Sequence, residues 1–543
     1  MRIKRSILAP LFVAVIGLST GGWFLQRGAA PGENVYMQAR LFEEVLQRVS
    51  SQFVDEKDPS QLYRMAIDGL LEELDDPHTA FLTPDDYEDL HIGTSGQYGG
   101  VGMQIDVRGD WVTVIAPLPG TPAERAGLQA GDRVIEIDGE STEGWTNDQA
   151  VAVLRGPEGE PVELKVARVG VDQPIPFTIV RAEIHVNSVQ TAYMVEPEIG
   201  YLEMTVFSET SAREMKESIA KLRAQGMKRL ILDLRRNPGG LLDQGVMVTE
   251  MFLDRGQAIA ETRSRAAGFS QTFKARSGEE FPDLPIVVLV GPYTASASEI
   301  FAGALQDHDR ALIIGQTTFG KGSVQTLYEL SGGNYLKLTT GRWYTPVGRS
   351  IDRPLDLEER AEALMAGPDA IENGAQARPD EEFRTDGGRT VYGGGGIFPD
   401  VVIRPDTLGQ PERDLGRALE RHGSDFNDVV YTWSVRYARE HPELEPGFEV
   451  TPAIMADFYD ALQGAGIAVE RVIYDAASDA LAKRLATEIT HVKWGDLERR
   501  RRWNAEDRQV RAAIEVLQQA TTPASVFAIA ERLKATQVGA AMR

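Results

Sequence analysis

A buried strand that runs directly into a helix is predicted within residues 284–325, and this stretch constrains the fold more than any other. Its first part, LPIVVLV, is short, apolar and rich in β-branched residues, as in a strand buried inside a sheet. From Ser298 onward apolar side chains recur at helical spacing, and a second buried strand is predicted at residues 311–314. Strands that alternate with helices in this way indicate an α/β sheet.

Two residues in this stretch, Ser296 and Lys321, are candidates for a nucleophile and its base. Ser296 lies where the predicted strand gives way to the helix, and the free N–H groups of a helix N-terminus favour developing negative charge. Lys321 lies between two glycines, and a lysine becomes a base when burial favours its neutral form. Lowering its pKa from about 10.4 to about 7–8 costs about 3–5 kcal/mol, so the fold has to bury it. A helix cap at Ser296 and a solvated charge at Lys321 would explain the same residues.

The segments TASASEIFAGALQD and TTFGKGSVQ, however, resemble the nucleophile and base motifs of the C-terminal processing (tail-specific) peptidases, a serine peptidase family with a Ser–Lys dyad. In that family the lysine follows the serine by 25 positions, as Lys321 follows Ser296, and this spacing selects Ser296 over Ser298. The resemblance implies that Gln325, one helical-type step after the lysine, orients the lysine amine.

A glycine turn follows another predicted buried strand, at residues 229–234. Its sequence, DLRRNPGG, resembles the glycine turn of the same family, which implies an oxyanion hole made by the N–H of Gly239 or Gly240 together with that of Ala297. Backbone donors need no side chain, and glycine permits close approach of a substrate. A turn without a catalytic role would need the same glycines.

Short strands are predicted between residues 96 and 181, where the segment AGLQAGDRVIEIDG resembles a PDZ domain. Such a domain accepts an extended peptide as an added strand and captures its terminal carboxylate with backbone N–H groups. The matching loop is Gly100, Val101, Gly102 and Met103, and its two apolar side chains suit a pocket for an apolar terminal residue. A β-module that acts only as a spacer is the alternative.

We therefore predict a multidomain α/β protein: a crotonase/Clp-protease-like α/β peptidase core, an inserted PDZ domain and helical N- and C-terminal regions. The expected boundaries are 1–30 for a signal peptide or membrane anchor, 31–95 for an N-terminal helical region, 96–181 for the PDZ domain, 182–408 for the core and 409–543 for a C-terminal helical domain. Residues 352–395 form an insertion in the core, expected to be a mobile surface loop, and the basic run at residues 499–502 is expected to be a solvated helix face.

The N-terminal segment indicates where in the cell the protein lies, and the net charge argues against one class of partner. Basic residues 1–5 precede an apolar stretch at residues 7–25, which suits a signal peptide or an uncleaved anchor and places the rest of the chain outside the cytoplasm, as in a periplasm. A net charge of −24 argues against nucleic acid as a partner. The chain has no cysteine, which excludes disulfides and thiolate metal sites, and no metal or cofactor is expected.

The resemblance implies a serine endopeptidase that cleaves proteins or peptides near their free C-termini. The alternative from another class is a peptide-binding scaffold or chaperone that has kept the fold, but the intact Ser296, Lys321 and Gln325 favour the enzyme. A Ser-His-Asp hydrolase lacks its G-x-S-x-G elbow here, and His308, on the predicted helix after Ser296, is expected to be exposed. The C-terminal helical domain is expected to serve packing, substrate entry or the formation of a homodimer.

Overall fold

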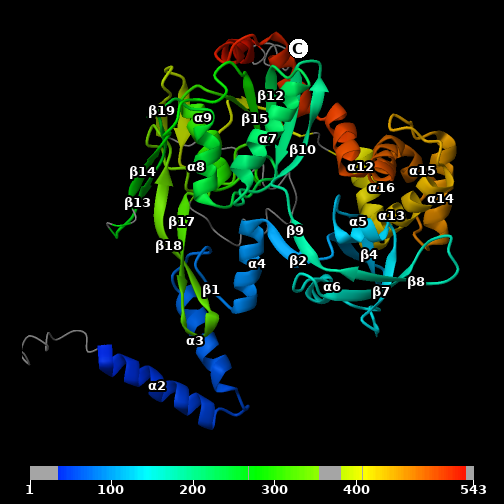
Figure 1. Cartoon of the computed structure of the whole chain (residues 1–543), viewed down its shortest axis with the longest axis horizontal. Helices are drawn as coiled ribbons and strands as arrows, with labels where there is room; N and C mark the ends of the chain where they lie inside the picture. Colours follow the sequence, from blue (N-terminus) through cyan, green and yellow to red (C-terminus); the bar gives the residue numbers. More distant parts are fainter. Residues whose placement is uncertain (1–34, 267, 269, 354–380, 406–407, 533–543) are drawn as a thin grey trace, which may run out of the picture. The chain divides into compact units, whose positions relative to one another are not determined.

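The computed structural model describes residues 35–266, 268, 270–353, 381–405 and 408–532 (Figure 1). The chain divides into two compact units, residues 1–81 and 82–543, and each is described by itself. The expected signal peptide or anchor at residues 1–30 lies outside the described residues.

The first unit contains the helices α2 (Val35–Gln52) and α3 (Pro59–Glu72). Asp58 caps α3 by accepting a hydrogen bond from the Ser60 N–H, and Pro59 occupies the first helical position, where its missing N–H costs nothing. The helices predicted in this region are confirmed. Many of their apolar side chains are exposed, among them Tyr36, Met37, Leu41, Phe42, Val45, Tyr63, Met65 and Leu70. Strand β1 (Ala80–Leu82) spans the boundary between the two units in sequence.

A six-stranded sheet forms the centre of the second unit. Its strands lie in the order β10, β11, β12, β15, β16 and β21, and only β10 is antiparallel to its neighbour. The bounds are β10 (Val189–Glu196), β11 (Ile199–Met204), β12 (Arg229–Asp233), β15 (Ile286–Val290), β16 (Leu312–Gly315) and β21 (Val401–Val402). Parallel strands covered on both faces read as unbroken apolar runs, which is why the sequence predicted β12, β15 and β16.

Helices cover both faces of this sheet. On one face lie α7 (Ser211–Ala224), α8 (Leu242–Glu250) and α9 (Ala297–Asp307), packed on side chains such as Leu232 and Val288. On the other face lies α17 (Arg508–Gln519), packed on alternate side chains of the same strands, such as Ile231 and Leu289. The C-terminal residues therefore complete the core, which extends beyond the expected boundary at 408.

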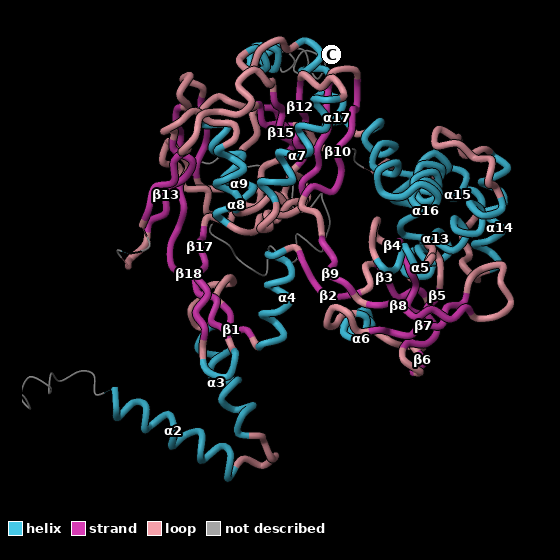
Figure 2. The backbone as a smooth tube through the Cα atoms, viewed as in Figure 1, coloured by secondary structure: helices cyan, strands magenta, loops and turns pink. Residues whose placement is uncertain are grey.

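A second sheet contains β14 (Gln271–Lys274), β13 (Ala258–Arg263), β18 (Tyr335–Tyr344) and β17 (Ser323–Glu329), in that order. Figure 2 shows β17 and β18 as one long hairpin. The expected insertion at 352–395 is not a mobile loop throughout: strands β19 (Glu381–Arg384) and β20 (Thr390–Gly393) form a hairpin within it. Arg389 holds this hairpin in place through ion pairs with Asp309 and Asp400.

The PDZ region has an apolar core of its own, with side chains such as Val114, Val134 and Leu164. Its elements are β3 (Met103–Arg108), β4 (Trp111–Pro117), α5 (Pro122–Ala126), β5 (Arg133–Ile137), β6 (Glu140–Ser141), α6 (Asn147–Leu154), β7 (Pro161–Ala167) and β8 (Ile175–Val180). The chain enters it through α4 (Pro84–Ser95) and β2 (Gln97–Gly100) and leaves through β9 (Ala182–His185). Because β2 and β9 pair as an antiparallel ribbon, entry and exit lie together (Figure 2).

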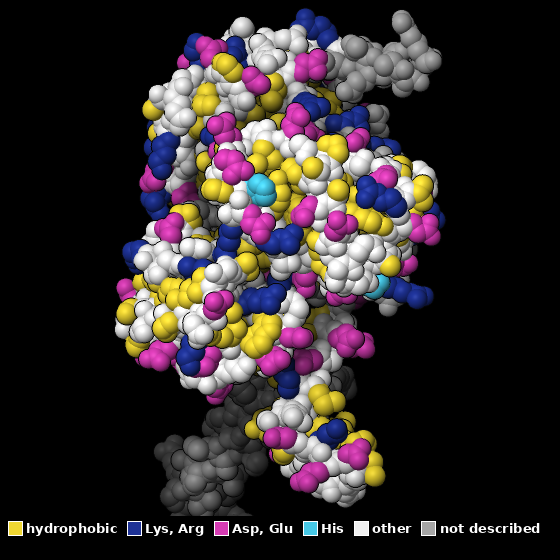
Figure 3. Space-filling view, turned by 90° about the vertical axis from the view of Figure 1, so that its right-hand side faces the viewer, with side chains coloured by type: hydrophobic (Ala, Val, Ile, Leu, Met, Phe, Trp, Pro, Cys, Tyr) yellow, Lys and Arg dark blue, Asp and Glu magenta, His cyan; other side chains and the backbone are white. Residues whose placement is uncertain are grey.

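The remaining helices pack around a separate apolar cluster that includes Trp433 and Phe458. They are α12 (Gln410–Leu419), α13 (Gly423–Glu440), α14 (Pro452–Gly464), α15 (Arg471–Ala476) and α16 (Ser478–Glu506). Helix α13 contacts the PDZ region, where the Tyr431 hydroxyl donates to the Val114 carbonyl and Asp428 pairs with Arg108. Figure 3 shows acidic and basic side chains interspersed over the face that it views.

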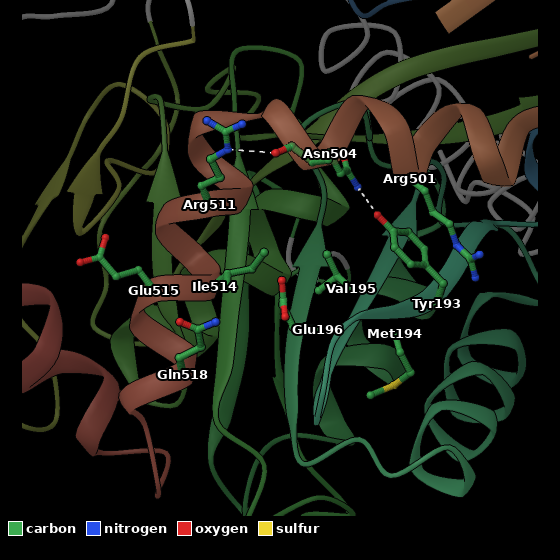
Figure 4. A pocket seen from close by; sticks show the side chains of 11 residues that line it. Tyr193, Met194, Val195, Glu196, Arg501, Asn504, Arg511, Ile514, Glu515 and Gln518 are labelled. Atoms are coloured by element: carbon green, nitrogen blue, oxygen red, sulfur yellow. Dashed lines mark hydrogen bonds between the residues drawn. The ribbon is translucent and has the colours of Figure 1, made fainter. Parts of the chain in front are cut away.

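The prediction that residues 499–502 form a solvated helix face holds for Arg501, which is exposed, but not for Arg500 and Arg502. Arg500 forms an ion pair of 2.7 Å with Glu203, a buried residue of the central sheet. Arg502 donates to the Pro446 carbonyl, and nearby Asn504 donates to the Tyr193 hydroxyl (Figure 4). These side chains therefore attach α16 to the sheet and to the loop between α13 and α14.

Candidate active site

Ser296 occupies the turn between β15 and α9, as predicted, and its backbone is strained. Its φ of 54° and ψ of −117° lie in a region that residues other than glycine rarely adopt. Such a conformation costs on the order of 1–3 kcal/mol and is concentrated at functional sites. Ser296 is partly exposed, whereas both of its neighbours, Ala295 and Ala297, are buried. The strain therefore places the Ser296 side chain at the surface between two buried neighbours.

Glu299, in the first turn of α9, connects the serine turn to the lysine loop. Its fully buried carboxylate accepts hydrogen bonds through Oε2 from the N–H groups of Ser296 (2.8 Å) and Lys321 (2.9 Å). Because both nitrogens contact one oxygen, they lie no more than about 6 Å apart. Oε1 accepts from the Thr318 hydroxyl at 2.5 Å and the Gly320 N–H at 2.7 Å.

Sequence reasoning missed Glu299, although a glutamate three residues after a serine helix cap is a known capping pattern. Burial raises the pKa of this carboxyl group, and the four hydrogen bonds from Thr318, Gly320, Lys321 and Ser296 act in the opposite direction. The donors surround both oxygens, so the group connects two loops rather than only capping the helix.

Lys321 lies in a loop whose close packing requires the flanking glycines. A Cβ on Gly320 would lie 2.9 Å from the Arg353 Cβ, and one on Gly322 would lie 2.8 Å from the Asp352 Cβ. The Lys321 carbonyl accepts a hydrogen bond from the Trp343 indole at 3.0 Å. The lysine is half-buried, so the full burial that we expected for a neutral amine is not present in this structure.

Gln325 lies on β17 rather than on a helix, so the four-residue step from Lys321 is not a helical turn. Its amide nitrogen donates to the Ser323 hydroxyl at 2.9 Å and to the Thr339 hydroxyl at 3.1 Å. These two bonds use both amide hydrogens and fix the orientation of the side chain, whose oxygen can still accept a hydrogen bond.

The glycine turn is attached to the serine turn through Asn237. The Asn237 carbonyl accepts from the Ala295 N–H at 3.1 Å and from the Ser298 hydroxyl at 3.0 Å, on either side of the serine. Its side chain donates to the Met204 carbonyl and accepts from the Gly239 N–H at 2.9 Å. Asn237 was part of the predicted turn, but its role depends on contacts between segments that are distant in sequence.

The two glycines of the turn differ in what their N–H groups do. A Cβ on Gly239 (φ 99°) would lie 2.7 Å from the Ala295 carbonyl oxygen and 2.8 Å from the Ser296 Cβ, so this glycine packs directly on the serine. Its N–H is already bonded to Asn237, whereas in the described part of the chain the N–H groups of Gly240 and Ala297 have no acceptor.

The predicted carboxylate loop of the PDZ region is fixed by its carbonyl groups. The Val101 carbonyl accepts from the Ala123 N–H, and the Gly102 carbonyl accepts from Leu118 and Thr121. Among the described residues, the N–H groups of Val101 and Gly102 have no acceptor. The Val101 and Met103 side chains are buried in the PDZ core, and Met103 begins β3, which is an edge strand.

His308 follows Ser296 by twelve residues in the sequence but lies at the opposite end of α9, too far away to act as its base. His308 caps the C-terminus of α9, and twelve residue steps of about 1.5 Å each place its backbone roughly 18 Å from that of the serine. Contrary to the prediction, its side chain is buried (8% exposed) and contacts the Ala258 carbonyl and Asp386. Within the described ranges, no group of His, Asp and Glu side chains could hold a metal ion.

A cavity of about 570 Å³ lies elsewhere, between β10 and the helices α16 and α17 (Figure 4). Its lining contains none of the predicted site residues and includes Tyr193, Glu196, Arg501, Arg511 and Ile514.

An exposed serine on a strained turn, a glycine turn with open N–H groups and an inserted peptide-binding module define a class: PDZ-containing serine peptidases with an α/β core. Comparison with known proteins agrees. Residues 198–356 match the model of peptidase family S41, and residues 113–168 match a PDZ domain.

Relatives identify the family. The chain is 42% identical over 323 residues to a carboxy-terminal-processing protease of Bartonella bacilliformis, covering 59% of this chain and 74% of that protein. It is 34% identical over 328 residues to the carboxy-terminal processing protease CtpA of Bacillus subtilis, covering 60% and 69%. The chain therefore belongs to the carboxy-terminal-processing proteases of family S41, and it is a serine peptidase.

The solved structures that it resembles include a photosystem II D1 C-terminal processing protease, with 30% identity over 69% of this chain and 90% of that chain. The TM-score of 0.36 is too low to support a structural argument.

Proposed function

We propose that Ser296 and Lys321 form the catalytic dyad of this peptidase. The Ser296 hydroxyl attacks the scissile carbonyl, the neutral Lys321 amine takes its proton, and the amine then protonates the leaving nitrogen. The single observation that carries the proposal is the shared contact with Glu299 Oε2, which holds the backbones of the two residues together.

The half-buried lysine requires a further step to lose its proton. A substrate bound over the serine turn excludes water from the amine, and the lower dielectric favours its neutral form. The amide oxygen of Gln325, whose two hydrogens are held by Ser323 and Thr339, accepts a hydrogen bond from the amine and orients it.

The oxyanion of the tetrahedral intermediate is bound by the N–H groups of Gly240 and Ala297. Both groups lack an acceptor within the described residues, whereas that of Gly239 is bonded to Asn237. Preorganised backbone donors of this kind are each worth roughly 10²–10³-fold in kcat. Gly239 contributes instead by its lack of a Cβ, which lets the turn pack against Ser296.

The dyad is tested by cleavage of an unfolded protein with an apolar C-terminus. Ser296→Ala and Lys321→Ala are each expected to abolish cleavage while the circular dichroism and Tm stay close to those of the wild type. A control, Ser277→Ala, removes an exposed serine hydroxyl that donates to Glu250, and is expected to retain activity. Cleavage that survives in both dyad variants would refute the proposal.

The PDZ domain receives the C-terminus of the substrate. The carboxylate binds the N–H groups of Val101 and Gly102, the peptide extends along β3, and Met103 contacts the terminal apolar side chain. Support comes from the open N–H groups of this loop and from the edge position of β3. Amidation of a peptide's C-terminus is expected to weaken its binding, measured by fluorescence anisotropy; equal binding of both forms would refute this role.

The protein acts outside the cytoplasm and is anchored or secreted through residues 1–30. The basic start and the apolar stretch at 7–25 support this location. No helix within the described ranges has the length and apolar character needed to cross a membrane. Fractionation of cells that produce the full chain tests the location, because recovery in the cytoplasm would contradict it.

A homodimer forms through α2 and α3. Their exposed apolar side chains, such as Leu41, Phe42 and Val45, form an amphipathic surface that a second copy can cover. Light scattering of a variant with Phe42→Glu and Val45→Glu is expected to show a monomer, whereas a monomeric wild type would exclude the dimer.

A further inference from the structure

The start of α17 contacts the glycine turn through one partly buried arginine. Arg235, two residues before Asn237, donates from Nη1 to Asp507 Oδ2 at 2.6 Å and to Gln509 Oε1 at 2.8 Å. Asp507 and Gln509 come 272 and 274 residues later in the chain. The C-terminal helical region, which we first expected to be a separate domain, therefore contacts the turn that carries Gly239 and Gly240.

Arg235 is held on its other side as well. Its guanidinium forms an ion pair with Asp233 at 2.6 Å, and its N–H donates to Asp233 Oδ1 at 2.9 Å. Its stem lies 3.8 Å from the position that a Cβ on Gly291 would occupy, at the end of the strand that leads to Ser296. Arg235 is thus placed between the glycine turn and the serine turn, with two carboxylates on one cation.

The first turn of α17 is a rigid support. Asp507 caps the helix by accepting from the N–H groups of Gln509 and Val510. The Gln509 amide also donates to the Ile403 carbonyl at 2.6 Å, and the inner face of the helix is buried on the central sheet. A side chain bonded to this turn is therefore fixed relative to the sheet.

We infer that Asp507 is a positioning residue for the glycine turn. It fixes Arg235, and through Arg235 it fixes the backbone that presents the Gly240 N–H. This inference rests on the proposed function of Gly240 and Ala297. An oxyanion donor must lie within a few tenths of an ångström of its place, so a turn that loses one of its supports loses transition-state binding more than substrate binding.

Asp507→Asn tests the inference, because asparagine caps helices as well as aspartate does, while the negative charge that pairs with Arg235 is lost. Asp233 still pairs with the arginine, so the variant is expected to fold. In the full-length protein we expect kcat to fall roughly 10- to 100-fold, with KM and Tm little changed. Asp58→Asn is the matched control, since Asp58 also caps a helix with its carboxylate but forms no ion pair with an arginine among the described residues, and it is expected to keep the wild-type kcat.

A second variant shows whether Asp507 acts through Arg235. Adding Asp507→Asn to Arg235→Gln is expected to cause no further loss of kcat, because the contact is already absent. A wild-type kcat in Asp507→Asn, a loss carried by KM instead of kcat, or additive losses in the double variant would each overturn the inference. Ser296→Ala is measured alongside: if it stays active the proposed dyad fails, and if it is inactive while Asp507→Asn is normal, only this inference fails.

Discussion

Ser296 and Lys321, 25 positions apart in the chain, donate their backbone N–H groups to the same oxygen atom, Oε2 of Glu299. Neither donation uses a side chain of the proposed dyad. The buried glutamate therefore limits the distance between the backbones of these two residues.

Replacing Glu299 with glutamine is expected to lower both stability and activity. Glutamine presents an NH₂ group to donors that need an acceptor, and each buried N–H left without a partner costs about 1–3 kcal/mol. We expect a lower free energy of unfolding in urea and, for the folded fraction, a kcat reduced by roughly 100-fold. Glu250→Gln is the control, because Glu250 accepts from Arg276 and Ser277 at an exposed site. Equal effects of the two variants on kcat would contradict the role of Glu299.

A methyl group on Gly239 is expected to abolish activity. In Gly239→Ala the Cβ would overlap the Ala295 carbonyl and the Ser296 Cβ at a positive φ, so the two turns have to move apart. We expect kcat/KM to fall by at least roughly 100-fold. Gly139→Ala has a similar φ of 86° but no atom within 4 Å of the added methyl, so it reports the backbone strain alone. Comparable peptidase activity in the two variants would show that the contact with Ser296 is unimportant.

Acid is expected to weaken the hydrogen bonds that Glu214 accepts from His185 on β9 and from residues 188–189, which follow that strand. Burial by itself would raise the pKa of Glu214, but hydrogen bonds from Thr210, Val189, His185 and Ser188 outweigh it and lower the pKa below 4.5. A carboxyl group with a lowered pKa stabilises the fold above pH 4.5, and this contribution is lost as the pH falls through its folded-state value. The difference in unfolding free energy between wild type and Glu214→Gln should therefore be largest near pH 7 and shrink below pH 4.5. A difference that does not change with pH would refute this assignment.

Loss of one hydroxyl is expected to loosen the contact between the PDZ domain and α13. Tyr431→Phe removes the hydrogen bond to the Val114 carbonyl, which is worth about 1 kcal/mol. Amides of β4 should then exchange faster with deuterium. Tyr474→Phe is the control, since its hydroxyl bonds Met455 within the helical region, and exchange in β4 should stay at the wild-type rate. Unchanged exchange in Tyr431→Phe would mean that this bond does not hold the domain.

Much of the fold could be read from local patterns. The apolar runs predicted β12, β15 and β16, and the change to helical spacing after Ser298 predicted α9, because burial and periodicity are properties of neighbouring residues. The strain at Ser296 could not be read in this way, since a positive φ at serine is imposed by surrounding contacts. The error at His308 has the same origin: a residue at a helix end is buried here because the hairpin of β19 and β20 carries Asp386 to it.

By itself, then, the sequence determined the order of strands and helices, the position of Ser296 at a strand-to-helix turn and the glycines that allow close packing. Tertiary structure alone decided that Glu299 joins the serine to the lysine loop, that Asn237 joins the glycine turn to the serine turn, and that α17 completes the core. The physical reason is range: periodicity and turn preferences act between neighbours, whereas a buried carboxylate or arginine selects its partners only after distant segments have packed together.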